Sequence, residues 1–387
     1  MPEPLSRPVV VLGGGILGLS VARELKLLGA QKVTVLERDA VGSVARGAAT
    51  CASLGVLSIP TSLKTPLNRL QALGHRAYRD LAGALRGETG MDVGYRVQGA
   101  LRLEAELPRE STRVKLERSY REAGVSCRWL VGNELRDMAP SISERFRAAL
   151  YLPEEAIVHP PLLVKGLQAS CEKHGVEVRE RTGDVRIRGV EGPRVELEGG
   201  EVFTGRTIVL AAGAWSTAVL SEEFPIRPPV EPVLGQAMEV RLPFSEGPNL
   251  HFLPQGLDKE YHLVPKGDGI AWVGATVEEA GFDARVTREG LGRLLLAAKE
   301  VLPNIEEGDV VRAWAGLRPR AQRRGGPFLG RLPGARDVWV AAGHYRGGIL
   351  IGPITTKLLA AEIVGDEGAI RAAGFDGESW AAFRVDR

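Results

Sequence analysis

The spacing of apolar residues changes within the N-terminal part of the chain. Residues 9–12 form an unbroken run of valines and a leucine, which predicts a strand buried on both faces. Residues 19–28 then carry apolar side chains at helical spacing, and Gly29 stands where a helix should end. A second apolar run follows over residues 32–36. The chain is therefore predicted to begin with a strand, a helix and a second, parallel strand.

Three glycines connect the first of these strands to the helix. Gly13, Gly15 and Gly18 have the spacing GxGxxG, and Glu37 ends the second strand 37 − 18 = 19 residues after the last glycine. In this context the glycines let a pyrophosphate approach a helix N-terminus, and the acid accepts hydrogen bonds from a ribose. A carboxylate here would repel a 2′-phosphate, which argues against NADP. The motif predicts a dinucleotide site without separating NAD from FAD; ordinary turn glycines are the alternative.

The remaining chain alternates helical and strand patterns. Helices are expected over 61–85, over the first part of 158–180 and over 287–303. Strands are expected after Gly175, over 206–212, in several pieces over 233–276, and over 337–343. The segment GHYRGGILIGP (343–353) then places glycines at the start of an apolar helical pattern. A glycine-rich turn that opens a helix is a ready anion site, so a ligand is expected there.

Composition narrows the class of protein. The 387 residues are 44% hydrophobic and 25% charged, which is ordinary for a globular chain of two domains or of one domain with an insertion. The net charge of +2 predicts no nucleic-acid partner. Cys51, Cys127 and Cys171 have neither disulfide-framework nor zinc-ligand spacing, which favours the reducing cytoplasm and no metal. The N-terminal pattern predicts no signal peptide, and no apolar run is long enough to predict a membrane span.

Several segments, taken in order, resemble FAD-dependent amino-acid oxidases of the glycine oxidase type, within the D-amino-acid oxidase family. They cover nearly the whole chain: ATCASLGVL (49–57), ETGMDVGYRVQGALRL (88–103), VLAAGAWS (209–216), YHLVPKGDGIAWVGATVEEAGFD (261–283), WAGLRP (314–319) and GHYRGGILIGP. The resemblance implies an α/β fold, in which a Rossmann-type FAD-binding domain carries an inserted antiparallel-sheet α+β substrate domain. The FAD-binding domain would comprise residues 1–85, 146–222 and 323–387, and the substrate domain residues 86–145 and 223–322. The proline-rich segment 224–232 would mark one crossing between them.

Arg318 is the leading candidate for a substrate contact. An arginine fork binds a carboxylate in a bidentate manner, which lysine does less well. The resemblance implies that Arg318 holds the substrate carboxylate, that the hydroxyl of Tyr261 assists, and that Arg346 belongs to the flavin loop. These three form the predicted catalytic set. A surface ion pair for Arg318 and a packing role for Tyr261 are the alternatives.

The cofactor implied by the resemblance is FAD, bound noncovalently because no cysteine is expected beside the flavin loops. His344 is expected to support the flavin rather than to act as a base, because hydride transfer from Cα needs an amine that is already neutral and the cofactor carries the chemistry. The predicted cofactor-binding residues are Gly13, Gly15, Ile16, Leu17, Gly18, Glu37, Arg38, Ala49, Thr50, Leu54, Gly55, Val56, Val185, Gly213, His344, Tyr345, Arg346, Gly347, Gly348, Ile349 and Leu350.

The implied reaction is the oxidative deamination of glycine, or of another small D- or N-methyl amino acid, to a 2-oxo acid, ammonia and hydrogen peroxide. The partners would be an amino acid and molecular oxygen, and a homo-oligomer stays open. A dehydrogenase of the same fold that passes electrons to a quinone or a partner subunit is one alternative, and a flavin-binding module without turnover is another. Arg323 and Arg324 replace a shorter family loop, and they could recognise an acidic side chain or form a solvated face.

Overall fold

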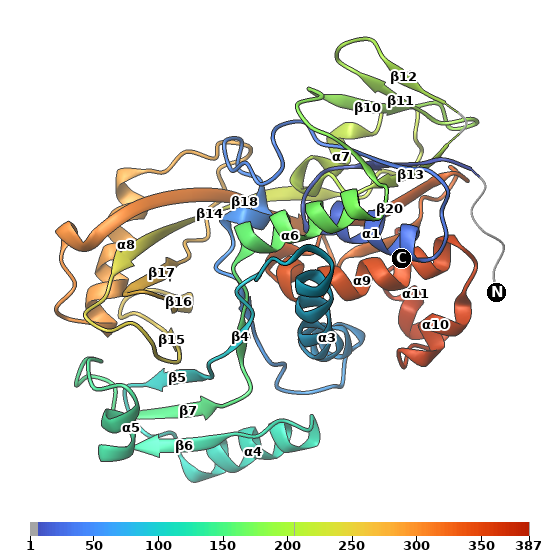
Figure 1. Ribbon diagram of the computed structural model, residues 1–387. Helices are drawn as coiled ribbons and strands as arrows, with labels where there is room; N and C mark the ends of the chain where they lie inside the picture. The colour runs from blue at the N-terminus through green and yellow to red at the C-terminus, as the bar shows by residue number, and fades with distance from the viewer. Residues whose placement is uncertain (1–6, 205, 387) are drawn as a thin grey trace.

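A computed structural model describes residues 7–204 and 206–386 (Figure 1). Within them, a six-stranded sheet has the order β19–β20–β13–β1–β2–β9. All neighbours pair in parallel except β19 and β20, which are antiparallel. The strands are β1 (Val9–Leu12), β2 (Val33–Leu36), β9 (Glu177–Arg179), β13 (Thr207–Leu210), β19 (Phe328–Arg331) and β20 (Val338–Ala342).

The two faces of this sheet pack into different apolar clusters. Val9 and Val11 face the helices, whereas Val10 and Leu12 face a small three-stranded sheet. Alternate side chains of a strand point to opposite faces, so a strand covered on both sides must be apolar at every position. The helices are α1 (Ile16–Leu27), α3 (Pro66–Thr89), α6 (Pro160–Lys173), α9 (Gly348–Ile363), α10 (Glu367–Ala372) and α11 (Gly377–Ala381). The small sheet comprises β10 (Val185–Arg188), β11 (Arg194–Leu197) and β12 (Val202–Phe203), beside α7 (Ser216–Val219).

A larger sheet lies beside the first (Figure 1). Its order in the described chain is β18–β14–β17–β16–β15–β5–β7–β6, with one parallel pair, β15 with β5. The strands are β5 (Ala100–Glu104), β6 (Arg128–Val131), β7 (Ala148–Leu152), β14 (Val230–Arg241), β15 (Asn249–Phe252), β16 (Tyr261–Gly267), β17 (Ile270–Gly274) and β18 (Val310–Ala321). Its apolar face is covered by α8 (Arg288–Val301), and α4 (Glu110–Glu122) and α5 (Asn133–Met138) lie towards the β6 edge.

Two long strands connect the sheets. β14 and β18 have 12 residues each and pair antiparallel from Val230–Ala321 to Val240–Val310. One end of this pair reaches the short helices that face the six-stranded sheet, η1 (Gly213–Trp215) and η3 (Tyr345–Gly347), and the other end lies under α8. A short sheet of β3 (Val56–Leu57), β8 (Ala156–Ile157) and β4 (Arg96–Val97) forms a second connection. The segment before β3 forms α2 (Ala49–Ala52), and η2 (Glu307–Asp309) precedes β18.

Most expected elements are confirmed, and one helix begins later than its pattern predicts. The helix expected over 61–85 begins at Pro66, because Thr65 caps it by accepting a 3.1 Å hydrogen bond from the Asn68 amide. It continues to Thr89, and Gly90 ends it with a positive φ of 74°. None of the described helices combines the length and the apolar content needed to cross a membrane.

The α/β fold class is confirmed, whereas the predicted division into domains stays a prediction with one correction. Strand β7 (Ala148–Leu152) pairs with β5 and β6 in the eight-stranded sheet, although the division assigns residues from 146 onward to the FAD-binding part. By this pairing, the boundary lies after β7. Residues 1–6, 205 and 387 of the division fall outside the described part of the chain.

Candidate active site

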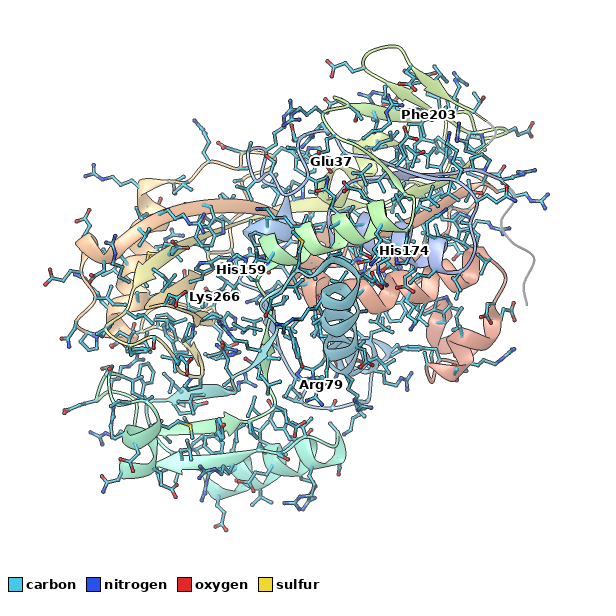
Figure 2. All side chains as sticks on the ribbon, viewed as in Figure 1. Glu37, Arg79, His159, His174, Phe203 and Lys266 are labelled. Atoms are coloured by element: carbon cyan, nitrogen blue, oxygen red, sulfur yellow. The ribbon has the colours of Figure 1, made fainter. Side chains whose placement is uncertain are left out.

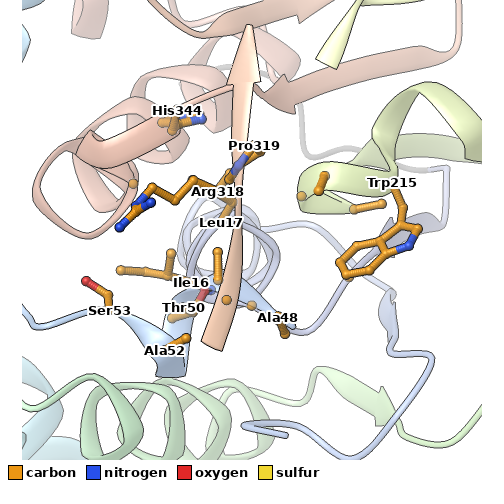
Figure 3. A pocket seen from close by; sticks show the side chains of 18 of the residues that line it. Ile16, Leu17, Ala48, Thr50, Ala52, Ser53, Trp215, Arg318, Pro319 and His344 are labelled. Atoms are coloured by element: carbon orange, nitrogen blue, oxygen red, sulfur yellow. The ribbon is translucent and has the colours of Figure 1, made fainter. Parts of the chain in front are cut away.

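A cavity of about 1010 Å³ lies where the long strands meet the six-stranded sheet. Its walls come from segments that are distant in sequence: the turn before α1, the α2 region, the end of β13, β18, and the turn before α9. Figure 3 shows Arg318 extending to one side of β18 while Trp215 stands on the other. We call the region around Gly13, Gly15, Glu37 and Trp215 the glycine end of the cavity. The region around Arg318, Arg346 and His262 is the arginine end.

At the glycine end, helix α1 begins without a capping side chain. Gly15 is its N-cap residue, and Thr50 accepts a 3.2 Å hydrogen bond from the Ile16 amide across the cavity wall. Gly13 has a φ of 108°, which disfavours any other residue. A Cβ at Gly18 would lie 1.8 Å from the Gly13 carbonyl oxygen. The glycines thus bring the helix start, with its free amides and positive dipole end, close to whatever anion the cavity holds.

Glu37 is fixed at the end of β2. One carboxylate oxygen accepts a 2.6 Å hydrogen bond from the Gly14 amide, and the other accepts a 3.0 Å bond from the Asp39 amide. Burial raises the pKa of Glu37, although these two amides act in the opposite direction. Each carboxylate oxygen keeps a second lone pair, which can accept from a sugar hydroxyl. Figure 2 locates Glu37 below the small β10–β12 sheet, whose Val185 also lines the cavity.

Two aromatic residues mark the outer wall of the glycine end. The guanidinium of Arg38 lies 4.3 Å from the Trp215 ring centroid, and Phe282 packs against the same indole at 5.6 Å. The loop 282–285 therefore forms part of the wall, together with Asp39 and Arg46. Sequence reasoning missed Trp215 and Phe282. The signal for Trp215 was its place directly after the β13 glycine turn, whereas Phe282 had none.

A second helix begins at the cavity without a capping side chain. Residues Tyr345–Gly347 form η3, and α9 starts at Gly348. Helix α3 holds this turn from behind: the hydroxyl of Tyr78 donates to the Ile349 carbonyl, and a Cβ at Gly74 would lie 2.3 Å from the Leu350 carbonyl oxygen. The glycine-rich segment therefore presents backbone amides to the cavity on a rigid support.

His344 precedes this turn and is fully enclosed. Its Nε2 lies 2.9 Å from the Thr355 hydroxyl. Burial lowers the pKa of His344 to about 3, so the imidazole is neutral at ordinary pH and is a weak base. This agrees with the predicted supporting role, although the role itself stays a proposal.

Arg318 dominates the arginine end. Its Nη1 donates to the carbonyls of Leu234 (3.2 Å) and Thr276 (3.0 Å), and the guanidinium occupies the space that a side chain at Gly235 would fill. Burial, followed by the charge of Arg346, lowers the pKa of Arg318 to about 10. Within the described residues, the hydrogen-bond partners of this guanidinium are those two carbonyls, and neither is a carboxylate. A buried cation with a free edge facing a cavity is a site for an anionic group.

Tyr261 is not on the cavity wall. It is buried in the apolar cluster under α8, whereas its neighbours in the chain, Glu260 and His262, line the cavity. This placement does not support the prediction that Tyr261 contacts substrate, and His262 is the cavity-facing residue at this point of the strand. Successive side chains of a strand point to opposite faces, so Glu260 and His262 face the cavity while Tyr261 faces the apolar cluster.

The other predicted residues divide into two groups. Gly18 and Gly55 lie behind the wall, where they allow close backbone packing. The following do line the cavity: Gly13, Gly15, Ile16, Leu17, Glu37, Arg38, Ala49, Thr50, Leu54, Val56, Val185, Gly213, Arg318, and all seven residues from His344 to Leu350. Arg323 and Arg324 do not, and Arg324 instead donates to the carbonyls of Arg384 and Ala382.

Lys266 fastens the loop that carries Leu54. Its ammonium donates to the Leu54 carbonyl (2.5 Å) and the Val158 carbonyl (3.3 Å), and it lies 4.5 Å from the Trp272 ring centroid. Burial lowers the pKa of Lys266 to about 7. His159 contacts the same indole, and Figure 2 shows His159 and Lys266 next to each other.

These features fit a flavin dinucleotide. Two helices begin at one cavity with glycine as the N-cap residue, and a Cβ at Gly13 or Gly18 would collide with the backbone at the first of them. The first suits a pyrophosphate, with Glu37 placed for a ribose. The second suits the electron-rich end of a reduced flavin ring, because helix dipoles stabilise negative charge.

Comparison with known proteins agrees with this geometry. A family model described as "FAD dependent oxidoreductase" matches residues 8–362. A glycine oxidase from Geobacillus kaustophilus is 32% identical over 370 residues, which is 95% of each chain. Among solved structures, glycine oxidase from Bacillus cereus has a TM-score of 0.82 at 29% identity, covering 94% of this chain and 96% of that one. Iminodiacetate oxidase from Chelativorans has a TM-score of 0.80 at 28% identity, covering 92% and 95%. The resemblance to glycine oxidases and the FAD cofactor are thereby confirmed, and the chain belongs to the family of FAD-dependent oxidoreductases.

Proposed function

We propose that the protein oxidises glycine, or another small amino acid, to a 2-oxo acid and ammonia, with oxygen as the electron acceptor. The observation that carries this proposal is Arg318, a buried guanidinium fixed by two carbonyls with a free edge on the cavity. The glycine oxidases that match nearly the whole chain support the same reaction.

Arg318 binds the substrate carboxylate through its free N–H groups, and its hydrogen bonds to two carbonyls hold the side chain in a fixed position. Gly235 has no side chain, so the guanidinium can occupy the space beside it. Fixing the carboxylate fixes the position of Cα, and orientation of this kind supplies much of the rate in a two-reactant step. When bound, FAD supplies the acceptor for the hydride that leaves Cα. The resulting imine hydrolyses in water.

The protein residues that would hold FAD are those of the two helix starts. Gly13 and Gly15 give the pyrophosphate access to the amides of α1, and Glu37 accepts from the ribose. Gly347 and Gly348 bring the amides of the second helix start to the flavin ring. No cysteine lines the cavity within the described residues, which supports noncovalent attachment. Acid precipitation of the protein would then leave all of the flavin in the supernatant.

A second substrate class has its own support. Arg346 also lines the arginine end, and its charge acts on Arg318. Two cations at one end suit an N-substituted glycine with a second carboxylate, and a similar solved structure is an iminodiacetate oxidase. Iminodiacetate therefore belongs among the compounds tested.

The experiment is an anaerobic visible spectrum of the purified yellow protein before and after glycine, sarcosine, D-alanine or iminodiacetate. Bleaching by one of the first three supports the small-amino-acid proposal, and bleaching by iminodiacetate alone supports the second class. A flavin that stays oxidised with all of them contradicts both. Peroxide release on admitting air separates an oxidase from a dehydrogenase that uses a quinone.

We also propose that the protein works in the reducing cytoplasm. Cys51 and Cys171 are buried free thiols, and burial raises the pKa of Cys51 to about 11 and of Cys171 to about 12. Such thiols are inert packing groups that need no oxidising compartment.

A further inference from the structure

A row of three polar side chains begins at the arginine end and runs into the protein interior, and the mechanism above does not use it. Glu155, in the turn between β7 and β8, accepts from the Nε2 of His251 on β15 at 2.7 Å. The Nδ1 of His251 lies 3.1 Å from the Nδ1 of His262 on β16. Glu155 and His251 are buried, at 1% and 5% exposure, whereas His262 lines the cavity. The row therefore runs from a buried carboxylate to the substrate side.

Hydrogen bonds fix the inner end of this row. Asn249 donates from Nδ2 to the same Glu155 oxygen at 3.0 Å, and Gln98 donates to the Asn249 carbonyl oxygen at 2.7 Å. Asn249 donates to Glu155, and an ionised Glu155 accepts from His251 at the same oxygen as well. His251 must then carry a proton on Nε2.

The nitrogen–nitrogen contact leaves two proton arrangements. Two ring nitrogens 3.1 Å apart share one hydrogen, which sits on His251 or on His262. If it sits on His262, the Nε2 of His262 has a free lone pair. If it sits on His251, that ring is an imidazolium and His262 carries its proton on Nε2. Among the described residues, no side chain or carbonyl pairs with that Nε2.

The surrounding charges favour the cation on the inner ring. Burial lowers the pKa of His251, but Glu155 and then Glu260 overcome this effect and Arg102 only partly opposes them, so the pKa is raised. His262 faces the opposite situation. Burial lowers its pKa far below the usual value, and the charges of His251, Arg346, Arg102 and Arg318 act in the same direction.

We propose that His262 accepts a proton from the ammonium group of the bound amino acid and transfers its own Nδ1 proton to His251, with Glu155 as the counter-ion of the resulting imidazolium. This inference rests on the proposed function. In this proposal His262 is the catalytic residue, because it lines the cavity beside Arg318, and His251 and Glu155 are positioning residues. The relay removes the charge that an amino acid carries on its ammonium group when it binds. This is needed because Cα cannot release a hydride until the amine is neutral.

The proton count balances without a further reactant. Before the transfer, His251 is neutral with its proton on Nε2, and His262 is neutral with its proton on Nδ1. The substrate N–H bond breaks and an Nε2–H bond forms on His262, while the Nδ1 proton of His262 moves to the Nδ1 of His251. The cation then lies beside Glu155, and the substrate amine keeps its lone pair. The relay is ready only when His251 starts neutral, so protonation at low pH blocks it.

A bound divalent cation is the rival interpretation. His251, Glu260 and His262 offer one ligand atom each within 4.8 Å of one another. However, Arg102 forms an ion pair with Glu260 at 3.4 Å, and the nitrogens of His251 already have partners. A cationic neighbour disfavours a metal ion. Activity that is lost with EDTA and restored by Zn²⁺ would overturn the relay.

The first test is the pH dependence of anaerobic flavin bleaching by the best amino acid, in the holoenzyme. In Glu155→Gln the acid limb should move to lower pH, because the charge that raises the pKa of His251 is gone. In His262→Gln the limb should move to higher pH, towards the pKa of the free ammonium, and the neutral-pH rate should fall about 100-fold. Glu154→Gln is the matched control, since the exposed side chain of this neighbour accepts only from the Ser126 amide. Limbs that stay in place in both relay variants would overturn the relay alone.

A second measurement does not depend on the substrate or on the variants folding. The chain has six histidines, so ¹⁵N-histidine labelling of the oxidised holoenzyme gives few imidazole signals. His251 should titrate above its ordinary pKa of about 6.5, and His262 should stay neutral. Titration of His251 below that value would overturn the relay. If His251 titrates as expected and no amino acid bleaches the flavin, the proposed function fails, and with it the assignment of the proton to an amino acid.

Discussion

The two ends of the cavity are formed by different kinds of chemical groups. At the glycine end, backbone amides and absent side chains make the site, and most of its parts come from one short segment, residues 13–18, with Glu37. At the arginine end, the imidazole of His262 on β16 meets the guanidinium groups of Arg318 on β18 and Arg346 in η3, although these residues are distant in sequence. The first end depends on space for a ligand that many proteins share. The second depends on the direction in which individual side chains point, and we propose that it determines substrate preference.

The largest effect is expected at the glycine end. In Gly18→Ala, the new Cβ would lie 1.8 Å from the Gly13 carbonyl oxygen, and a backbone atom cannot rotate away. Helix α1 must then move off β1, so the purified protein should be colourless. Flavin absorbance per protein measures this, with Gly292→Ala in α8 as the control, where a Cβ meets nothing within 4 Å. A yellow Gly18→Ala protein would show that the helix start does not hold the cofactor.

A weaker effect, limited to substrate, is expected at the arginine end. Arg318→Lys keeps the charge but loses the fork, so KM for the amino acid should rise about 10- to 100-fold. Flavin content should not change. The control is Arg312→Lys on the same strand, whose exposed side chain pairs with Glu239. Equal KM values in the two variants would contradict the assignment of substrate binding to Arg318.

His344 lies between the ends and tests the pH dependence of stability. Its folded pKa of about 3 is below the unfolded value near 6.5. Between these values the unfolded chain binds the extra proton, so the free energy of unfolding falls as pH decreases through this window. The contribution is at most about 1.4 kcal/mol per pH unit. Urea unfolding of the holoenzyme at fixed FAD should show a shallower slope in His344→Gln. An identical slope would mean that His344 is protonated in the fold.

The smallest effect concerns a glycine that serves neither end. Gly83 lies exposed in α3, and a Cβ there would meet nothing within 4 Å. Gly83→Ala should raise the free energy of unfolding by about 0.5–1 kcal/mol, because alanine loses less entropy in a helix. Flavin content and KM should match the parent protein. A destabilised variant would indicate that this part of α3 contacts something more than solvent.

The same contrast explains what the sequence could predict. The glycine end follows from local rules: a strand, a GxGxxG turn, a helix and an acid at fixed spacing, all of which the structure contains. The turn before α9 was predictable for the same reason. The resemblance to a known family then supplied FAD and the order of the segments.

The arginine end was only partly predictable, for physical reasons. Tyr261 and His262 are adjacent in sequence, and only the pairing of β16 with β15 and β17 determines which of them faces the cavity. The row from Glu155 to His262 joins three distant segments, and no short motif describes it. The sequence left open whether Arg323 and Arg324 recognise an acidic side chain or form a solvated face, because closeness to Arg318 in the chain does not determine which way a side chain points. The structure places neither of them on the cavity wall.

The antiparallel pair β14–β18 has a mechanical consequence. The pair lies at one edge of the eight-stranded sheet and runs from the FAD-binding side of the cavity to the end of the sheet that lies under α8. Bending this pair would strain its ladder of backbone hydrogen bonds, so the pair holds Arg318 in a fixed position relative to the rest of the sheet. Phe282, which packs against Trp215, belongs to a loop of the cavity wall outside this pair. The opposite edge of the sheet, formed by β6 beside α4, is the most distant from this pair in the strand order. A fusion partner attached there should therefore leave the shape of the cavity unchanged.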